Sequence, residues 1–202
     1  MRRGPRGCSV ADARDGTRLI EAARLVLRPP VAGDLGWLVA NLNTPAVTAY
    51  VGGVRTPEAV ADGMADNIDE WARTGRGYWM IVLRDTGAIA GKCGWSSIDD
   101  PSAPPAIAGA LQVGWSLAEP YWGKSIAFDA ARAVISHVFA HERPAAIYAQ
   151  TTEWNRASTR LIERLGFIRQ AHLDYIDPEY PAYDNPTTIH AMDLPAWEAM
   201  GG

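Results

Sequence analysis

The sequence predicts an α/β domain in which helices pack on the faces of one mixed β-sheet. Residues 78–83 form a continuous apolar run, typical of a strand that is covered on both faces, and residues 88–97 return as its hairpin partner. Further along the chain, strand and helix patterns alternate. These later elements are expected at residues 110–117, 126–140, 145–151, 155–165, 167–175 and 187–192. The chain thus begins with strands and continues as strand–helix–strand–helix–strand. This order is typical of a mixed sheet with helices on its faces.

The composition is that of an ordinary globular protein. The 202 residues are 48% hydrophobic and 21% charged, which suits one domain with a sizeable core. A net charge of −4 argues against non-specific nucleic-acid binding. No apolar run approaches the ~20 residues that span a membrane, and no signal core follows Arg2 and Arg3. We therefore expect a cytoplasmic protein without nucleic-acid or membrane partners.

The first part of the chain begins without any periodic pattern. Residues 1–17 are predicted to be a mobile leader, and residues 18–202 a single domain. The first strand is expected over residues 19–28, because Pro29 and Pro30 cannot continue a strand ladder. Helices are predicted over residues 34–42 and 56–73, the second opening with a capping threonine and a proline.

The helix predicted over residues 126–140 has a wide apolar stripe, with Asp129, Arg132 and Ser136 outside it. Gly166 suits a left-handed cap at the end of the following helix. The two cysteines cannot make a disulfide framework, and Cys93, within an apolar stretch, is expected to be a small buried hydrophobe.

The segment between residues 111 and 127 points to phosphate binding. A strand enters a short loop with Gly123 and Lys124, and a helix begins directly after it. The first turn of a helix offers unpaired N–H groups and partial positive charge. Gly123 lets a ligand approach, Lys124 adds a cation, and Ser125 is placed to cap the helix. The alternative is a turn glycine followed by a solvated lysine, and the spacing alone does not decide between them.

A second helix start of the same kind follows the next strand. Asn155 is a natural N-cap, and Ser158 lies in the same first turn. A well-capped helix explains each of these residues singly. It does not explain why two phosphate-like helix starts follow neighbouring strands.

Together these motifs resemble the GNAT superfamily of N-acetyltransferases. The resemblance rests on Tyr121-Trp122-Gly123-Lys124-Ser125-Ile126-Ala127, on Asn155-x-x-Ser158, and on Leu161-x-Glu163-x-Leu165-Gly166-Phe167. Within the superfamily the chain is similar to the branch that acetylates ribosomal-protein N-termini. That likeness is carried by Arg24-Leu25-Val26-Leu27-Arg28-Pro29 and Val113-Gly114-Trp115. The match covers about residues 19–194.

The resemblance implies a mostly antiparallel sheet of six to seven strands, with helices on both faces and the fourth and fifth strands splayed apart. Acetyl-CoA then lies in the gap and donates its acetyl group directly to a primary amine of a protein N-terminus or small molecule. A homodimer is common among similar proteins, and no metal is expected. The residues implied to bind the cofactor are Trp115, Ser116, Leu117, Gly123, Lys124, Ser125, Ile126, Ala127, Phe128, Asn155 and Ser158.

Two departures from the family pattern concern cofactor binding and proton transfer. Ser125 stands where the superfamily usually has a phosphate-loop glycine, so cofactor binding is expected to be weaker. Ile162 and Gln150 replace a tyrosine acid and a glutamate base of many relatives. Ser158 is the candidate to protonate or position the leaving thiolate. The same departures support an alternative function, an acyl-CoA-binding module without turnover that serves sensing or assembly.

The acceptor side is the least determined part of the sequence. A third departure, at Asp177 where some relatives have histidine, leaves four unranked candidate bases: Asp99, Asp100, His172 and Asp177.

The aromatic residues and histidines have predicted places as well. Trp79 is expected in the core, Trp95 in the wall of an acceptor pocket, and Trp122 as a clamp on the phosphate loop. His137 and His141 are expected at a polar helix end without metal spacing. Tyr180, Tyr183 and Asp184 are expected to belong to a loop that borders the acceptor.

Overall fold

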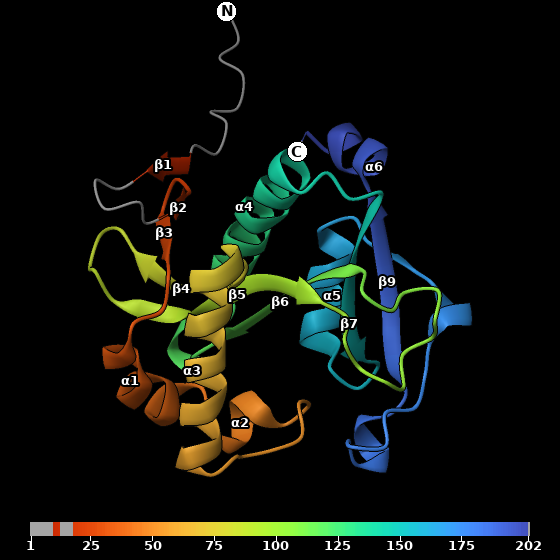
Figure 1. Cartoon of the computed structure of the whole chain (residues 1–202), viewed down its shortest axis with the longest axis horizontal. Coiled ribbons are helices and arrows are strands. Elements are labelled where there is room, and N and C mark those ends of the chain that lie inside the picture. The colour runs from red at the N-terminus through yellow and green to blue at the C-terminus, as the bar shows by residue number, and fades with distance from the viewer. Residues whose placement is uncertain (1–9, 13–17, 202) are drawn as a thin grey trace, which may run out of the picture.

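A computed structural model describes residues 10–12 and 18–201, whose strands form one nine-stranded sheet (Figure 1). Every neighbouring pair in the order β1-β2-β3-β4-β5-β6-β7-β9-β8 is antiparallel except β6 and β7. The strands are β1 (Val10–Asp12), β2 (Arg18–Glu21), β3 (Leu25–Arg28), β4 (Gly77–Leu83), β5 (Ile89–Ser97), β6 (Leu111–Leu117), β7 (Ala146–Thr152), β8 (Ile168–Arg169) and β9 (Thr187–Asp193).

The helices begin and end largely where capping chemistry predicts. Thr56 caps α3 by accepting a hydrogen bond from the Ala59 N–H, and Gly75 ends this helix in the left-handed region (φ 72°). The helices are α1 (Leu35–Asn41), α2 (Pro45–Thr48), α3 (Pro57–Thr74), α4 (Ile126–His141), α5 (Arg156–Arg164) and α6 (Leu194–Ala199), with 3₁₀ turns η1 (Ala32–Asp34), η2 (Glu119–Tyr121), η3 (Ala171–Leu173) and η4 (Ala182–Asp184). None of these described helices is long and apolar enough to cross a bilayer.

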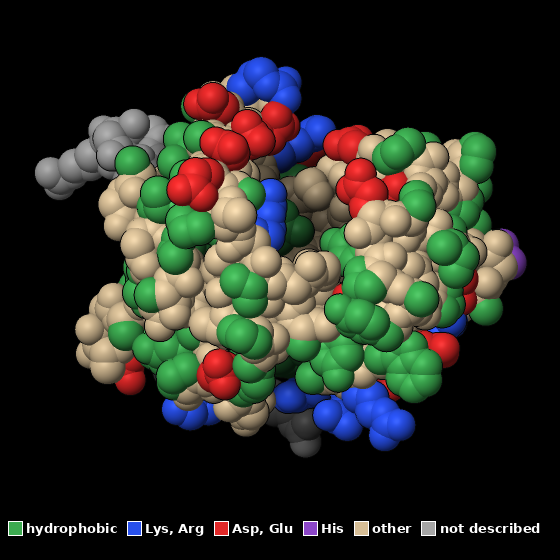
Figure 2. Space-filling model, turned by 90° about the horizontal axis from the view of Figure 1, so that it is seen from below, with side chains coloured by type: hydrophobic (Ala, Val, Ile, Leu, Met, Phe, Trp, Pro, Cys, Tyr) green, Lys and Arg blue, Asp and Glu red, His purple; other side chains and the backbone are tan. Residues whose placement is uncertain are grey.

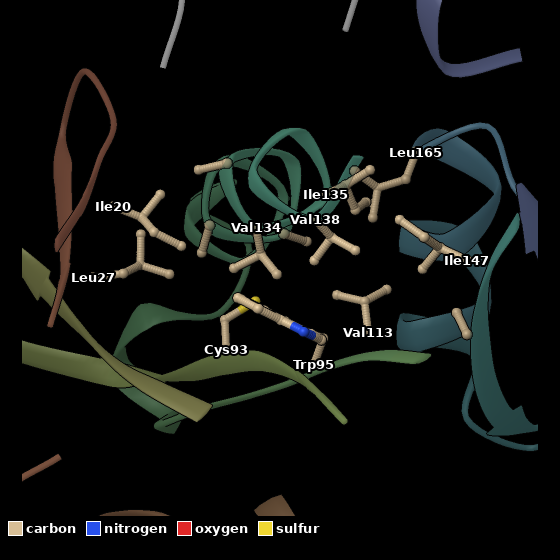
Figure 3. Close-up of a cluster of buried hydrophobic side chains, with 14 of the residues drawn as sticks. Ile20, Leu27, Cys93, Trp95, Val113, Val134, Ile135, Val138, Ile147 and Leu165 are labelled. Carbon is tan, nitrogen blue, oxygen red and sulfur yellow. The ribbon is translucent and has the colours of Figure 1, made fainter. Parts of the chain in front are cut away.

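The two faces of the sheet carry different layers of helices. Trp79 and Ile81 of β4 pack in the main core with α4, whereas Met80 between them packs with Met64 of α3 and Leu38 of α1. Because successive side chains of a strand point to opposite faces, α3 and α4 cover opposite faces of β4 to β6. Figure 3 shows the α4 side of this core, where side chains of α4 point toward those of β5 and β6.

The predicted fold class is confirmed, but the sheet has more strands than expected. The strand predicted over residues 19–28 is a hairpin of β2 and β3, closed by hydrogen bonds between Ala22 and Leu25. β8 keeps only two residues of the strand predicted over 167–175, because η3 follows it directly. Of the predicted leader, residues 10–12 form β1 beside β2, and residues 1–9 and 13–17 lie outside the described residues.

The splay of the sheet lies where the resemblance implied it, between β6 and β7. These strands pair in parallel at Gln112 and Tyr148, and in the described part of the chain this is the one backbone ladder pair between them. β6 instead pairs along its whole length with β5, and β7 with β9. The edge of β6 from Val113 to Leu117 therefore faces an opening in the sheet.

Candidate active site

A large cavity begins at this opening and continues across the α3 face of the sheet. Its volume is about 1240 Å³, and its lining includes β4, β5 and β6, the first turns of α4 and α5, and parts of α1 to α3. Figure 2 shows this side of the molecule as hollowed, with Lys and Arg side chains gathered along its lower edge. Pockets for a single small ligand commonly measure roughly 300–1,000 Å³, so this cavity has room for a cofactor and a second substrate.

The cavity brings together all but one of the residues predicted to bind the cofactor. Lining residues from that set are Trp115, Ser116, Leu117, Gly123, Ser125, Ile126, Ala127, Phe128, Asn155 and Ser158. The Trp115 ring packs against the main core, so this residue offers its backbone rather than its side chain. Lys124 is the exception. Its ammonium lies 5.8 Å from the centre of the Tyr121 ring, and its carbonyl accepts a hydrogen bond from Arg24.

Ser125 occupies the backbone conformation that its usual glycine would adopt. Its φ and ψ are 59° and 14°, in the left-handed region. Its hydroxyl does not cap α4, contrary to the prediction. Instead the hydroxyl accepts a hydrogen bond of 3.3 Å from Arg164, which draws the side chain toward α5. Gly123 is also left-handed (φ 71°), and apart from its two chain neighbours no residue has an atom within 4 Å of the point where a Cβ would be.

Replacing Ser125 with glycine is expected to raise the free energy of unfolding by about 1 kcal/mol, because the left-handed strain disappears. Urea denaturation measures this change. Ser125→Ala is the matched control, since it removes the hydroxyl but keeps the strain. A glycine variant no more stable than the alanine variant would contradict the strain argument.

Two arginines that sequence analysis did not select complete the basic end of the cavity. Arg160 and Arg164 of α5 both line it, and the Arg164 guanidinium lies 4.0 Å from the centre of the Phe128 ring. Guanidinium groups beside a helix N-terminus suit a polyphosphate. The signal in the sequence was their four-residue spacing, which places both on one side of the helix that Asn155 opens.

The start of α5 presents a hydroxyl to the same cavity. The Asn155 carboxamide oxygen accepts a hydrogen bond of 3.1 Å from the Ser158 N–H, and Ser158 itself lines the cavity. Ile162 is 1% exposed and lies in the core, so no titrating group takes the place of the missing tyrosine there.

Gln150 belongs to a polar network rather than to an acid–base pair. Its amide nitrogen donates to Gln112 (3.0 Å), and its oxygen accepts from the Tyr175 hydroxyl (2.8 Å). The Tyr175 oxygen also lies 3.0 Å from a carboxylate oxygen of Asp100. This network joins the wall of the cavity to the loops beyond β5 and β8.

The four candidate bases lie outside the cavity lining. Asp99 and His172 are exposed, as solvated loop residues would be. Burial and the nearby charge of Asp100 raise the pKa of Asp177. Burial opposes ionisation of Asp100 as well, but hydrogen bonding, chiefly from the Ser102 N–H, outweighs it and lowers the pKa of Asp100. A base role for any of the four stays a prediction.

Tyr78 is a cavity residue that sequence analysis placed only in an apolar run. It pairs with Gly94 across β4 and β5, and Gly94 pairs with Gly114 across β5 and β6. A Cβ on Gly114 would lie 2.5 Å from the Tyr78 hydroxyl oxygen, so that hydroxyl reaches β6. Burial raises the pKa of Tyr78 to about 12, which keeps the hydroxyl protonated at neutral pH.

Replacing Gly114 with alanine is expected to lower the free energy of unfolding by about 2 kcal/mol, because the new methyl group meets the Tyr78 hydroxyl. The double variant with Tyr78→Phe should recover part of this loss, since the hydroxyl is removed. Thermal unfolding of both variants and of Tyr78→Phe alone tests the coupling. Strictly additive changes would show that the two side chains do not meet.

The prediction that Trp95 forms a pocket wall is wrong. Trp95 is 1% exposed, and its ring stacks on Trp79 with 4.5 Å between ring centres. Since Ser96 faces the cavity, the strand alternation turns Trp95 to the α4 side. Cys93, on the same strand, is buried in the core, which confirms its prediction.

Other predicted positions have mixed outcomes. The Trp122 indole donates a hydrogen bond of 2.8 Å to the Leu117 carbonyl, which confirms it as a clamp between β6 and the loop. His137 is buried rather than at a polar helix end. In the last loop Tyr180 lines the cavity, whereas Tyr183 and Asp184 do not. Over residues 10–12 and 18–201, no three His, Cys, Asp or Glu side chains are grouped to hold a metal.

Comparisons with known proteins agree with this geometry. The family model described as the acetyltransferase (GNAT) domain matches residues 24–168. A curated relative, the uncharacterized N-acetyltransferase p20 of Bacillus licheniformis, is 27% identical over 155 residues, which are 75% of this chain and 84% of the relative.

Two solved structures show the same fold. The acetyltransferase from Agrobacterium tumefaciens str. C58 has a TM-score of 0.73 at 22% identity, over 95% of this chain and 100% of the other. The ribosomal-protein-S5-alanine acetyltransferase from Vibrio fischeri has a TM-score of 0.67 at 17% identity, over 89% and 98%. With a family model that matches most of its length, the chain belongs to the GNAT family of acetyltransferases.

Proposed function

We propose that the protein transfers the acetyl group of acetyl-CoA to a primary amine. The observation that carries this proposal is one continuous cavity, which joins the basic starts of α4 and α5 to the open edge of β6 and to the α3 face of the sheet. The basic helix starts suit a pyrophosphate, and the open edge of β6 suits an extended pantetheine arm. The α3 face leaves space for an acceptor.

Each part of the cavity has a role in the proposed transfer. Residues 123–128, with Arg160 and Arg164, bind the phosphates. The backbone of Trp115 to Leu117 binds the pantetheine arm, and a free N–H on this edge stabilises the oxyanion that forms when the amine attacks the thioester. The C–S bond then breaks, and the Ser158 hydroxyl helps to protonate the leaving thiolate.

The transfer is proposed to be direct, without an acetyl-enzyme intermediate. Cys93 is fully buried, and burial raises the pKa of its thiol well above the usual range, so it stays protonated. Its side chain also lies in the core on the α4 face of β5, whereas Lys92 and Ser96 on either side line the cavity.

Calorimetric titration with acetyl-CoA, with CoA and ATP as controls, tests the first half of the proposal. Release of free thiol in the presence of amines tests the second. Saturable binding without consumption in the presence of any amine would favour the acyl-CoA-binding module instead. A folded protein that binds no acetyl-CoA would contradict both functions.

A further inference from the structure

Two cationic side chains that the transfer step does not use line the acceptor part of the cavity. Lys92 lies on β5 opposite Ser116 of β6, and its ammonium is 5.1 Å from the centre of the Tyr78 ring. Arg55 precedes α3. The Asn43 carboxamide accepts from the Arg55 N–H (2.9 Å) and donates to the Arg55 carbonyl (2.8 Å). The backbone of Arg55 is thus fixed at the mouth of the cavity.

Neither cation has an acidic partner within the described residues. Of the two carboxylates in the lining, Glu70 is bound by Arg73 and Thr74, and Asp66 is in no ion pair. Burial, and then the positive charge of Arg55, lower the pKa of Lys92. The Lys92 side chain is half-buried, and Arg55 is exposed in the lining of the same cavity. A bound anion would offset both the repulsion between the two cations and the burial of the Lys92 ammonium.

The surroundings of the mouth carry the opposite charge. The outer part of α3 is acidic, with Glu58, Asp62 and Asp69 exposed outside the cavity lining. Figure 2 shows Asp and Glu side chains gathered beside the hollow, and Lys or Arg at its wall. An acidic rim attracts an ammonium group and repels a molecule that is only anionic. Cations inside an acidic rim therefore suit a ligand that carries both charges.

We infer that the acceptor is a small amino acid, whose carboxylate binds between Lys92 and Arg55 while its amine faces β6. This inference rests on the proposed acetyl transfer and specifies its substrate class. Residues opposite each other on antiparallel strands lie only ~5 Å apart. Lys92 and Ser116 line the same cavity from opposite positions on β5 and β6. A carboxylate at the Lys92 ammonium and a thioester at the proposed site along β6 therefore call for a compact acceptor, with its amine only a few bonds from the carboxylate. The nitrogen bonds to the acetyl carbon, the C–S bond breaks, and CoA leaves as the thiol with a proton from the amine.

Matched acceptors test the inference directly. Thiol release is measured at saturating acetyl-CoA with L-leucine and L-phenylalanine, with the α-amide of each, and with spermidine. The acids should exceed their amides in kcat/KM by at least about tenfold, the range of one hydrogen bond between charged groups. The amides have the larger fraction of neutral amine at a given pH, so intrinsic reactivity works against this result. Equal use of acid and amide, or a preference for spermidine, would overturn the inference.

Charge-removing variants locate the effect. Lys92→Met and Arg55→Gln should each raise KM for the acids about tenfold and leave KM for the amides unchanged, and Lys92→Arg should restore most of the preference. Arg84→Gln is the charge-matched control, because Arg84 is exposed and lies outside the cavity lining. Circular dichroism confirms that each variant is folded. If both variants still prefer the acids over the amides, Lys92 and Arg55 do not bind the acceptor carboxylate.

The inference and the proposed function can fail separately. Acids and amides that release thiol at the same rate would leave acetyl transfer intact and refute the acceptor assignment. Thiol release from none of the amines would refute transfer. The acceptor assignment is then judged by calorimetric titration of L-leucine and its amide into the CoA-saturated protein, where only the acid should bind. If L-leucine does not bind in this titration, the acceptor assignment is refuted as well.

Discussion

Replacing Asp34 with alanine is expected to lower the free energy of unfolding by about 3 kcal/mol. The Asp34 carboxylate accepts hydrogen bonds of 2.6 and 2.7 Å from the two terminal nitrogens of Arg28 and one of 2.9 Å from the Val31 N–H. The Asp34 side chain is 5% exposed and that of Arg28 is 29% exposed. Loss of the carboxylate leaves the guanidinium and the Val31 N–H partly buried without these bonds. Urea denaturation measures the change.

The Arg28→Met and Asp34→Ala double variant is the control for this prediction. It removes both charges and should be less destabilised than the sum of the single variants, because no unpaired charge remains buried. An Asp34→Ala variant as stable as the original protein would contradict the assigned role.

The same pair gives stability a defined pH dependence. Burial alone would raise the pKa of Asp34, but the hydrogen bonds from Arg28 and the Val31 N–H outweigh it and lower the pKa. A carboxyl whose folded pKa is depressed stabilises the protein above its unfolded pKa of ~3.9, and this contribution is lost as the pH falls through the lower folded value. The difference between the original protein and Asp34→Ala should therefore narrow in acid.

Long periodic elements were predictable because their pattern determines which face is buried. The stripe of α4 and the apolar run of β4 gave correct elements because tertiary burial agrees with local periodicity there. The short helices α2 and α6 were missed, since four to six residues hold too little pattern. The β2–β3 turn was missed because it contains neither glycine nor proline and is defined by pairing with the next strands.

The two halves of the site differ in predictability for a related reason. The proposed cofactor half is local in sequence, with a loop and two helix starts whose unpaired N–H groups follow from capping rules. The proposed acceptor half combines Arg55, Tyr78 and Lys92 from three separate elements. Only the β-sheet register and the path of the loop before α3 bring them together, and neither can be derived from local pattern. The error at Trp95 has the same origin, because it depended on which face of β5 is buried.

Replacing Ser158 with alanine is expected to lower kcat about a hundredfold while acetyl-CoA binds with unchanged affinity. Alanine keeps the backbone N–H that donates to Asn155, so α5 remains capped and only the hydroxyl is lost from the cavity. A thiolate that leaves without a nearby proton donor must be protonated by water, which raises the barrier for breaking the C–S bond rather than the energy of the bound complex. Rapid-mixing measurement of thiol release and calorimetry of acetyl-CoA binding separate the two quantities.

Thr159→Ala is the matched control, because the neighbouring hydroxyl donates to the Asn155 carbonyl (3.1 Å) and does not line the cavity. That variant should keep its kcat. If Ser158→Ala keeps its kcat as well, the amine proton reaches the leaving sulfur by another path, and the polar network of Gln112, Gln150 and Tyr175 is the nearest connected group in the wall of the cavity. If Ser158→Ala instead weakens acetyl-CoA binding with kcat unchanged, the hydroxyl binds the pantetheine arm equally in the ground state and the transition state, which is a binding role and not a catalytic one.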